Sequence, residues 1–218
     1  MSGEKDTMRQ YHVHVKFVQP ILGTSSADPA IHERFIASKA PDAPSLKEEV
    51  EALGADAVEE RGTTIFPKRP DGTPFLWDYQ IKGFFKDACG GMRRATGSKS
   101  AKLRAYKKEI DTTVFVNQRN VVLRVPEGEP VRVLQRPLRA QTAQGERVAL
   151  ASSEMLPAGT TCDFDLTLLN DDTTQYVLEW LAYGRLRGIG QWRNAGYGAF
   201  QCRVENADGR ELFSNLDD

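Results

Sequence analysis

An apolar stripe with helical spacing, from Ile81 to Met92, constrains the fold more than any other segment. It consists of Ile81, Phe84, Phe85, Ala88, Cys89 and Met92. Residues that recur every three or four positions share one face of a helix, and Asp78 precedes them as a candidate N-cap. A second stripe of Val177, Trp180, Leu181 and Gly184 follows Asp171 and Asp172, either of which can cap it. The chain therefore predicts two amphipathic helices, over residues 78–94 and 173–186.

Alternating apolar side chains predict the strands of a sheet. In residues 11–18, Val13, Val15 and Phe17 fall on one side and polar residues on the other. The other predicted strands cover residues 112–116, 121–125, 162–168 and 197–204. Strand, helix, strands, helix, strand is the order of an α+β, ferredoxin-like (RRM-like) fold, in which an antiparallel sheet carries both helices on one face. With 40% apolar residues, one such domain over residues 1–218 is expected.

Charge is distributed unevenly along the chain, although the net charge is only −1. Residues 28–62, within an expected acidic insertion over 19–62, carry nine acidic and four basic side chains. Residues 68–108 carry eleven basic and three acidic ones, and an expected basic insertion or hairpin region over 95–147 adds further arginines. Basic segments of this kind favour a polyanionic partner such as single-stranded RNA. The alternative is a solvated basic helix.

A glycine-rich stretch over residues 184–200 joins the second helix to the last strand. It holds five glycines, arginines, and the aromatic rings of Trp192 and Tyr197. Glycine lets a backbone approach a ligand closely, and arginine pairs with phosphate in a planar fork. The stretch therefore predicts a polyanion site with two stacking surfaces. An ordinary helix-to-strand turn, with both rings packed at the strand, is the alternative.

The predicted nucleic-acid-binding residues form a basic set and a glycine-rich set. The basic set is Lys82, Lys86, Arg93, Arg94, Lys102, Arg104, Arg136 and Arg139. The glycine-rich set is Arg185, Arg187, Gly188, Gly190, Trp192, Arg193, Asn194, Gly196, Tyr197 and Gly198. With no acid, base or nucleophile in the glycine-rich set, it is better suited to holding a polyanion than to cutting one.

No metal, cofactor or membrane partner is expected. His12 and His14 lie on the polar side of the first predicted strand, without a third ligand at a recognisable spacing. The three cysteines, at positions 89, 162 and 202, are odd in number and far apart, which indicates reduced core residues. Neither an apolar signal region at the N-terminus nor a run of about 18 apolar residues is present, so we expect a cytoplasmic protein.

Three segments of the chain resemble the RAMP superfamily, the repeat-associated proteins that form the RNA-binding backbone and the processing nucleases of CRISPR systems. Residues 188–200 are similar to its C-terminal glycine-rich loop, which precedes the last strand. Residues 153–160 resemble the segment before its second helix, and residues 81–86 resemble the lysine-glycine motif that opens its first helix. The family's Pro-Gly-Ser-Ser lead-in to that helix is here Trp77-Asp78-Tyr79-Gln80, which lacks the serine hydroxyls.

The resemblance also implies two catalytic candidates. Members that cut target RNA carry an aspartate in a loop after the first strand, and Asp28 is the comparable residue. Processing members often use a histidine near the first helix, for which His32 is the analogue. A helix cap for Asp28 and a surface position for His32 are the alternatives.

Three functional hypotheses follow. The leading one is a non-catalytic subunit that binds single-stranded RNA, or single-stranded DNA, together with other subunits or copies of itself in a CRISPR-type ribonucleoprotein. The second is a small endoribonuclease, in which His32, or His12 with His14, transfers protons or Asp28 binds a metal. The third is a phage-encoded protein-interaction factor that docks through the acidic insertion.

Overall fold

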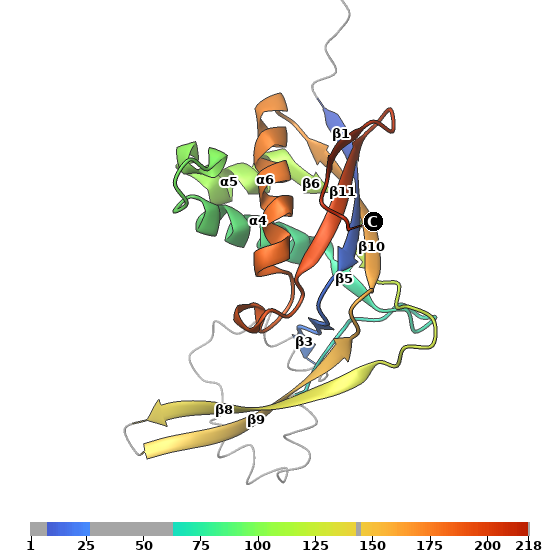
Figure 1. Cartoon of the computed structure of the whole chain (residues 1–218), viewed down its shortest axis with the longest axis vertical. Helices are drawn as coiled ribbons and strands as arrows, with labels where there is room; N and C mark the ends of the chain where they lie inside the picture. Colours follow the sequence, from blue (N-terminus) through green and yellow to red (C-terminus); the bar gives the residue numbers. More distant parts are fainter. Residues whose placement is uncertain (1–7, 27–62, 143–144, 218) are drawn as a thin grey trace, which may run out of the picture. The chain divides into compact units, whose positions relative to one another are not determined.

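The computed structural model describes residues 8–26, 63–142 and 145–217. The chain divides into two compact units (Figure 1). The first is formed by Met1–Ile21, Lys68–Glu129 and Pro157–Asp218, and the second by Leu22–Pro67 and Pro130–Leu156. The expectation that residues 1–218 form a single domain stays a prediction.

A five-stranded antiparallel sheet organises the first unit. Its strands are β1 (Arg9–Phe17), β6 (Val114–Val116), β10 (Thr161–Leu168), β11 (Phe200–Asn206) and β12 (Glu211–Ser214). They lie in the order β12-β11-β1-β10-β6, with Val13 opposite both Phe164 and Val204. Without the edge strand β12, the other four strands and the two long helices between them in sequence reproduce the split strand-helix-strand arrangement. The ferredoxin-like fold predicted from the sequence is therefore confirmed.

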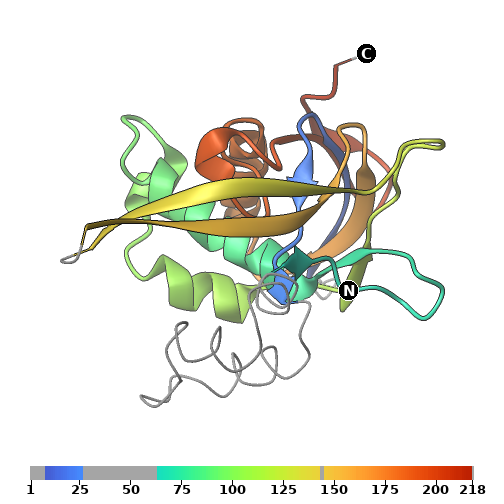
Figure 2. The ribbon, with the colours of Figure 1, turned by 90° about the horizontal axis from the view of Figure 1, so that it is seen from below.

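Helices cover one face of this sheet (Figures 1 and 2). They are α4 (Asp78–Met92), α5 (Tyr106–Thr113) and α6 (Asp171–Arg187), with the short 3-10 turns η1 (Lys99–Lys102) and η2 (Arg193–Ala195). Phe84 of α4 meets Phe200 of β11 edge-on at 5.2 Å between ring centroids. Phe85 packs against Trp180 of α6 at 5.8 Å. Burying each such side chain contributes about 1.5–3 kcal/mol, so this aromatic layer anchors both helices to the sheet.

The caps of the two long helices differ from the sequence prediction. Trp77, not Asp78, is the N-cap of α4, because the Gln80 side chain reaches back and accepts a hydrogen bond from the Trp77 backbone N–H at 2.7 Å. The α4 helix ends at Met92, before Arg93 and Arg94. Asn170 is the N-cap of α6, which makes the neighbouring aspartates part of its first turn. Their carboxylates still interact favourably with the positive end of the helix dipole.

Three strand predictions also need correction. Residues 112 and 113 belong to α5, so the strand that follows begins at Val114. The segment predicted over 121–125 is β7 (Asn120–Val122), which pairs with β5 (Phe75–Trp77) in a separate two-stranded sheet. Residues 211–214, where no strand was predicted, form the edge strand β12. For β7 and β12, pairing with a distant segment decides the structure, which local composition does not reveal.

A long hairpin dominates the second unit. Strands β8 (Arg132–Thr142) and β9 (Gly145–Leu156) pair in register from Arg132 opposite Met155 to Thr142 opposite Gly145 (Figure 2). The short strands β2 (Ile21–Leu22), β3 (Ser25–Ser26) and β4 (Thr64–Ile65) complete its sheet. The basic hairpin predicted from the sequence is therefore present. Most of the acidic insertion, with Asp28 and His32, lies outside the described residues.

All three cysteines are free and buried, as predicted. Burial raises the pKa of the Cys89 thiol to about 11 and that of Cys202 to about 12, and also raises the pKa of Cys162. Since unfolded thiols ionise near 8.5, the stability contributed by neutral thiols is complete below about pH 8.5 and is lost as pH rises towards 11.

Iodoacetamide at pH 8 is therefore expected to leave these thiols unmodified in the folded protein and to alkylate all of them in denaturant. The reason is that the thiolate is the reacting species and both burial and the raised pKa suppress it. Mass spectrometry of the intact protein measures the number of adducts. Alkylation of Cys89 in the folded protein at this pH would contradict the buried position.

Candidate nucleic-acid interface

The glycine-rich loop is closed by a backbone crossing at its two ends. Helix α6 ends where Gly188 adopts a positive φ of 74°. The Ile189 N–H donates to the Gly198 carbonyl at 3.0 Å, and the Gly198 N–H donates to the Pro20 carbonyl at 2.8 Å. A Cβ atom at Gly198 would lie 1.8 Å from the Ile189 carbonyl oxygen. Only glycine fits at this crossing, which fixes the loop between the second helix and the last strand.

The two rings of the loop lie on each other. Trp192 and Tyr197 stack with centroids 5.3 Å apart and planes 9° from parallel. Trp192 has a φ of 52°, in the left-handed region that costs a non-glycine residue about 1–2 kcal/mol. The stack and the η2 turn that follows hold this conformation. One face of each ring is therefore used within the loop, while Trp192 remains 42% exposed.

A single carboxylate holds the loop against α4. Asp87 accepts a forked pair of hydrogen bonds from Arg187, 2.7 Å from Nε and 3.3 Å from the second guanidinium nitrogen. It also accepts one from Arg193 at 3.0 Å, and Arg187 donates to the Asn194 side chain. The hydrogen bond to Asp87 raises the pKa of Arg187 above its usual value. Two predicted phosphate ligands are thus positioned by one aspartate, which neutralises only one of their charges.

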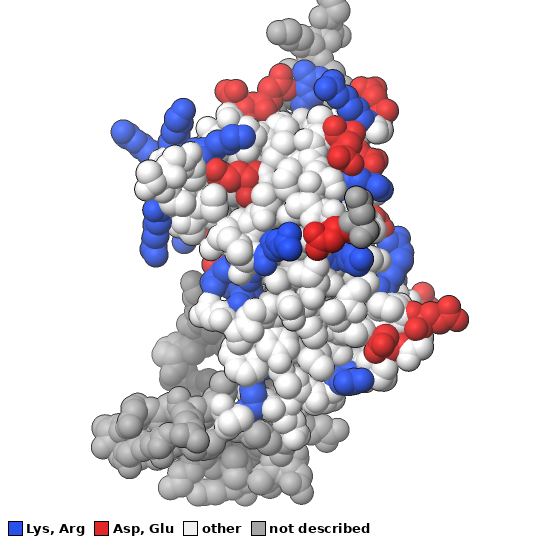
Figure 3. All heavy atoms as spheres, viewed as in Figure 1, with Lys and Arg blue, Asp and Glu red and all other residues white. Residues whose placement is uncertain are grey.

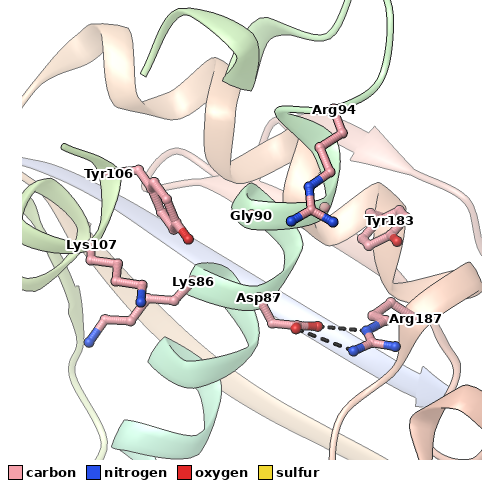
Figure 4. A pocket seen from close by; sticks show the side chains of 9 residues that line it. Lys86, Asp87, Gly90, Arg94, Tyr106, Lys107, Tyr183 and Arg187 are labelled. Carbon is pink, nitrogen blue, oxygen red and sulfur yellow. Dashed lines mark hydrogen bonds and ion pairs between the residues drawn. The ribbon is translucent and has the colours of Figure 1, made fainter. Parts of the chain in front are cut away.

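A pocket of about 560 Å³ opens beside this cluster, between α4, α5 and α6 (Figure 4). Its lining is Lys86, Asp87, Gly90, Gly91, Arg94, Tyr106, Lys107, Tyr183 and Arg187. Lys86 is paired with Asp111 at 2.7 Å and Arg187 with Asp87. Arg94 and Lys107 have no carboxylate partner within the described part of the chain. The pocket therefore presents two uncompensated cations beside two tyrosines.

Basic side chains continue from the pocket over the neighbouring surface. Figure 3 shows Lys and Arg gathered where α5 and the segment before it lie in Figure 1. The exposed basic residues of this segment are Arg93, Arg94, Lys99, Lys102, Arg104, Lys107 and Lys108. Between Asp78 and Glu109 the only acidic residue in the sequence is Asp87. The segment from Arg93 to Lys108 thus places seven exposed cations on the helical side of the first unit.

Other predicted ligands are already engaged within the first unit. The Lys82 ammonium donates to the Asp111 carbonyl at 3.2 Å and lies 5.2 Å from the Phe115 ring centroid. Arg93 covers the Tyr106 ring at 5.1 Å, and Arg185 lies 3.8 Å from Asp217. These contacts are exposed and weak, so they leave the charges available to a ligand.

The hairpin residues are placed differently. Arg136 is only 8% exposed and donates to the Ser153 hydroxyl at 3.3 Å within the second unit. Arg139 belongs to β8, and its side chain lies outside the described residues, as do Asp28 and His32. Gly190 and Gly196, like Gly188 and Gly198, have positive φ values and shape the loop.

Paired imidazoles and carboxylates line the sheet face opposite the helices. His12 lies 2.8 Å from Asp165, and His14 lies 2.6 Å from Asp163, which also accepts from Arg124. Partial burial raises the pKa of Asp163, but the hydrogen bonds from His14 and Arg124 outweigh it, so this pKa lies below its usual value. Ionised aspartates repel phosphate, so this face favours RNA less than the helical side does.

Sequence reasoning missed Asp87, Tyr106, Lys107 and Tyr183 as site residues. Asp87 was visible as the isolated acid in a basic segment, and Lys107 belonged to the same basic run. The tyrosines gave no signal, because only the packing of α5 and α6 against α4 brings them to one pocket. Among the described residues, no three His, Cys, Asp or Glu side chains gather to bind a metal. None of the described helices is long and apolar enough to cross a membrane.

No protein-family model and no curated protein matches the sequence. Solved structures do match, among them a chain in the cryo-EM structure of the Type III-B Cmr-beta bound to cognate target RNA. The TM-score is 0.52 at 12% sequence identity. The match covers 91% of this chain and 60% of the other, so this chain spans about three fifths of its length. At this identity the likeness shows a shared fold.

Proposed function

We propose that this protein is a non-catalytic subunit that binds single-stranded RNA within a CRISPR-type ribonucleoprotein, alongside other subunits or copies of itself. The observation that carries the proposal is the pair of uncompensated cations, Arg94 and Lys107, in a pocket that continues into an exposed basic surface. The fold shared with a chain from a complex bound to target RNA supports the same class of partner. The resemblance to the RAMP superfamily points in this direction and stays a prediction.

Two kinds of contact bind the strand in this proposal: cations contact its phosphates, and aromatic rings stack on its bases. Arg94 and Lys107 pair with phosphate oxygens of the strand, and Lys86 joins them by exchanging Asp111 for a phosphate oxygen. Arg187 and Arg193 present the remaining positive charge from the loop. The aromatic rings beside these cations give unpaired bases a surface on which to stack. The bases of a duplex cannot use this surface, because they already stack on one another. Such contacts are tolerant of sequence, as expected of a subunit that holds a strand.

Replacing both Arg94 and Lys107 with alanine is expected to weaken binding of an unstructured RNA about 10- to 100-fold, because each loses a charge-assisted contact. The negative slope of log affinity against log salt should become shallower by about 1.4, since each single-strand phosphate contact contributes about 0.7 to its magnitude. Fluorescence anisotropy over a range of salt concentrations measures both quantities.

Lys16→Ala provides the matched control, because Lys16 is exposed on β1, between His14 and the end of the strand. It should leave affinity and slope unchanged. An RNA affinity that is absent, or that does not fall as salt rises, would refute the proposed function. An equal loss in Lys16→Ala would move the interface to the sheet.

A further inference from the structure

We infer that the pocket between α4, α5 and α6 recognises a terminal phosphomonoester, so that the protein holds the phosphorylated end of an RNA strand. This inference rests on the proposed function and adds the chemical group that the pocket selects. It is carried by the charge of the pocket, by two hydroxyl donors and by a helix terminus.

The charge of the pocket matches a dianion. Four cations and one carboxylate line it, and Asp111 outside the lining offsets Lys86. Two cations, Arg94 and Lys107, remain without a carboxylate among the described residues. A phosphomonoester carries about −1.5 to −2 near neutral pH, whereas each internal diester carries a single charge. The pair therefore neutralises a terminal phosphate more completely than it neutralises an internal one.

Two tyrosine hydroxyls supply further donors in the lining of the pocket, on either side of Gly90 in Figure 4. The hydroxyls of Tyr106 and Tyr183 make no hydrogen bond with any residue that the structure describes. Each lies against a glycine of α4: a Cβ atom at Gly90 would be 3.1 Å from the Tyr106 oxygen, and one at Gly91 would be 3.2 Å from the Tyr183 oxygen. Figure 4 shows Tyr106 and Arg94 reaching into the same space. The two glycines leave room for hydroxyls that can donate to phosphate oxygens.

The N-terminus of α5 adds a third contribution. Tyr106 and Lys107 are its first two residues, and both line the pocket. Ala105, the N-cap, provides no side-chain hydrogen bond to the first turn. The first N–H groups of a helix lack partners within it and carry the positive end of its dipole, which favours an anion. A phosphate in the pocket would serve as the missing cap.

The size of the pocket also suits a strand end. A volume of about 560 Å³ is in the range of small-ligand sites, which span about 300–1,000 Å³. A terminal nucleotide can place its phosphate in such a space with only one strand connection leaving the pocket. An internal nucleotide must bring the chain both in and out between three helices.

The test compares one unstructured RNA in three forms: with a 5′-phosphate, with a 3′-phosphate, and with hydroxyls at both ends. Anisotropy with an internal label should show one phosphorylated form binding about tenfold or more tightly than the hydroxyl form, the gain of charge-assisted hydrogen bonds. The form that gains identifies the end that is bound. The double variant Tyr106→Phe, Tyr183→Phe keeps both rings and should lose most of that preference, while Lys16→Ala should keep it.

The outcomes separate the two proposals. Equal binding of all three forms overturns the terminal-phosphate inference and leaves the RNA-binding function standing. An unchanged preference in the double tyrosine variant overturns the assignment to this pocket. Binding of uridine monophosphate but not uridine, without binding of any RNA, supports the pocket's ligand and overturns the proposed function.

Discussion

Gly198→Ala is expected to lower the free energy of unfolding by about 2–5 kcal/mol, combining the cost of a positive φ with that of overpacking. The new methyl group would lie 1.8 Å from the Ile189 carbonyl oxygen, a backbone atom that cannot rotate away. The crossing must open, which breaks the hydrogen bond between the Ile189 N–H and the Gly198 carbonyl. Urea denaturation followed by circular dichroism measures the loss.

Gly196→Ala separates the two causes of this effect. Gly196 also has a positive φ, of 89°, but nothing lies within 4 Å of a Cβ atom placed there. It should cost only about 1–2 kcal/mol, the price of the left-handed conformation alone. If the two variants were equally stable, the backbone crossing would not be tight, and the loop would not be fixed as the structure shows.

The elements of the fold were predictable where sequence periodicity reports burial directly. The stripe is buried as expected from Ile81 to Cys89, and Val13, Val15 and Phe17 form the buried face of the first strand. The tail strand β12 was not predictable, because its residues pair with β11 through backbone groups rather than through an apolar pattern. Periodicity identifies elements that bury a face and is silent about edge strands.

The candidate site was predictable in part, and for a similar reason. The glycines and arginines identified the loop as a candidate polyanion site, since the capacity for a positive φ and the cationic fork are properties of single residues. The role of Asp87 depends on a contact across 100 residues with Arg187, and the tyrosine pair depends on helix packing. The basic segment was found from its charge, but only the structure places three of its cations, Lys86, Arg94 and Lys107, around one pocket beside the loop.

Asp87→Ala is expected to destabilise the protein by about 2–4 kcal/mol, because three charge-assisted hydrogen bonds are lost and two half-buried guanidinium groups keep no carboxylate. The side chains involved are each less than a third exposed. Asp111→Ala, which breaks the more exposed pair with Lys86, is the matched control and should cost under about 1 kcal/mol. Thermal and urea denaturation of both variants give the comparison.

The same variant should also weaken RNA binding, although it removes a negative charge from a basic surface. The reason is that Asp87 fixes Arg187 and Arg193 in one orientation, and unfixed side chains must be ordered again when the strand binds. The loss of a negative charge alone would strengthen RNA binding. This is the result expected for Asp111→Ala, whose affinity for RNA should rise slightly. Tighter RNA binding by Asp87→Ala would show that this carboxylate competes with phosphate for the two arginines instead of positioning them.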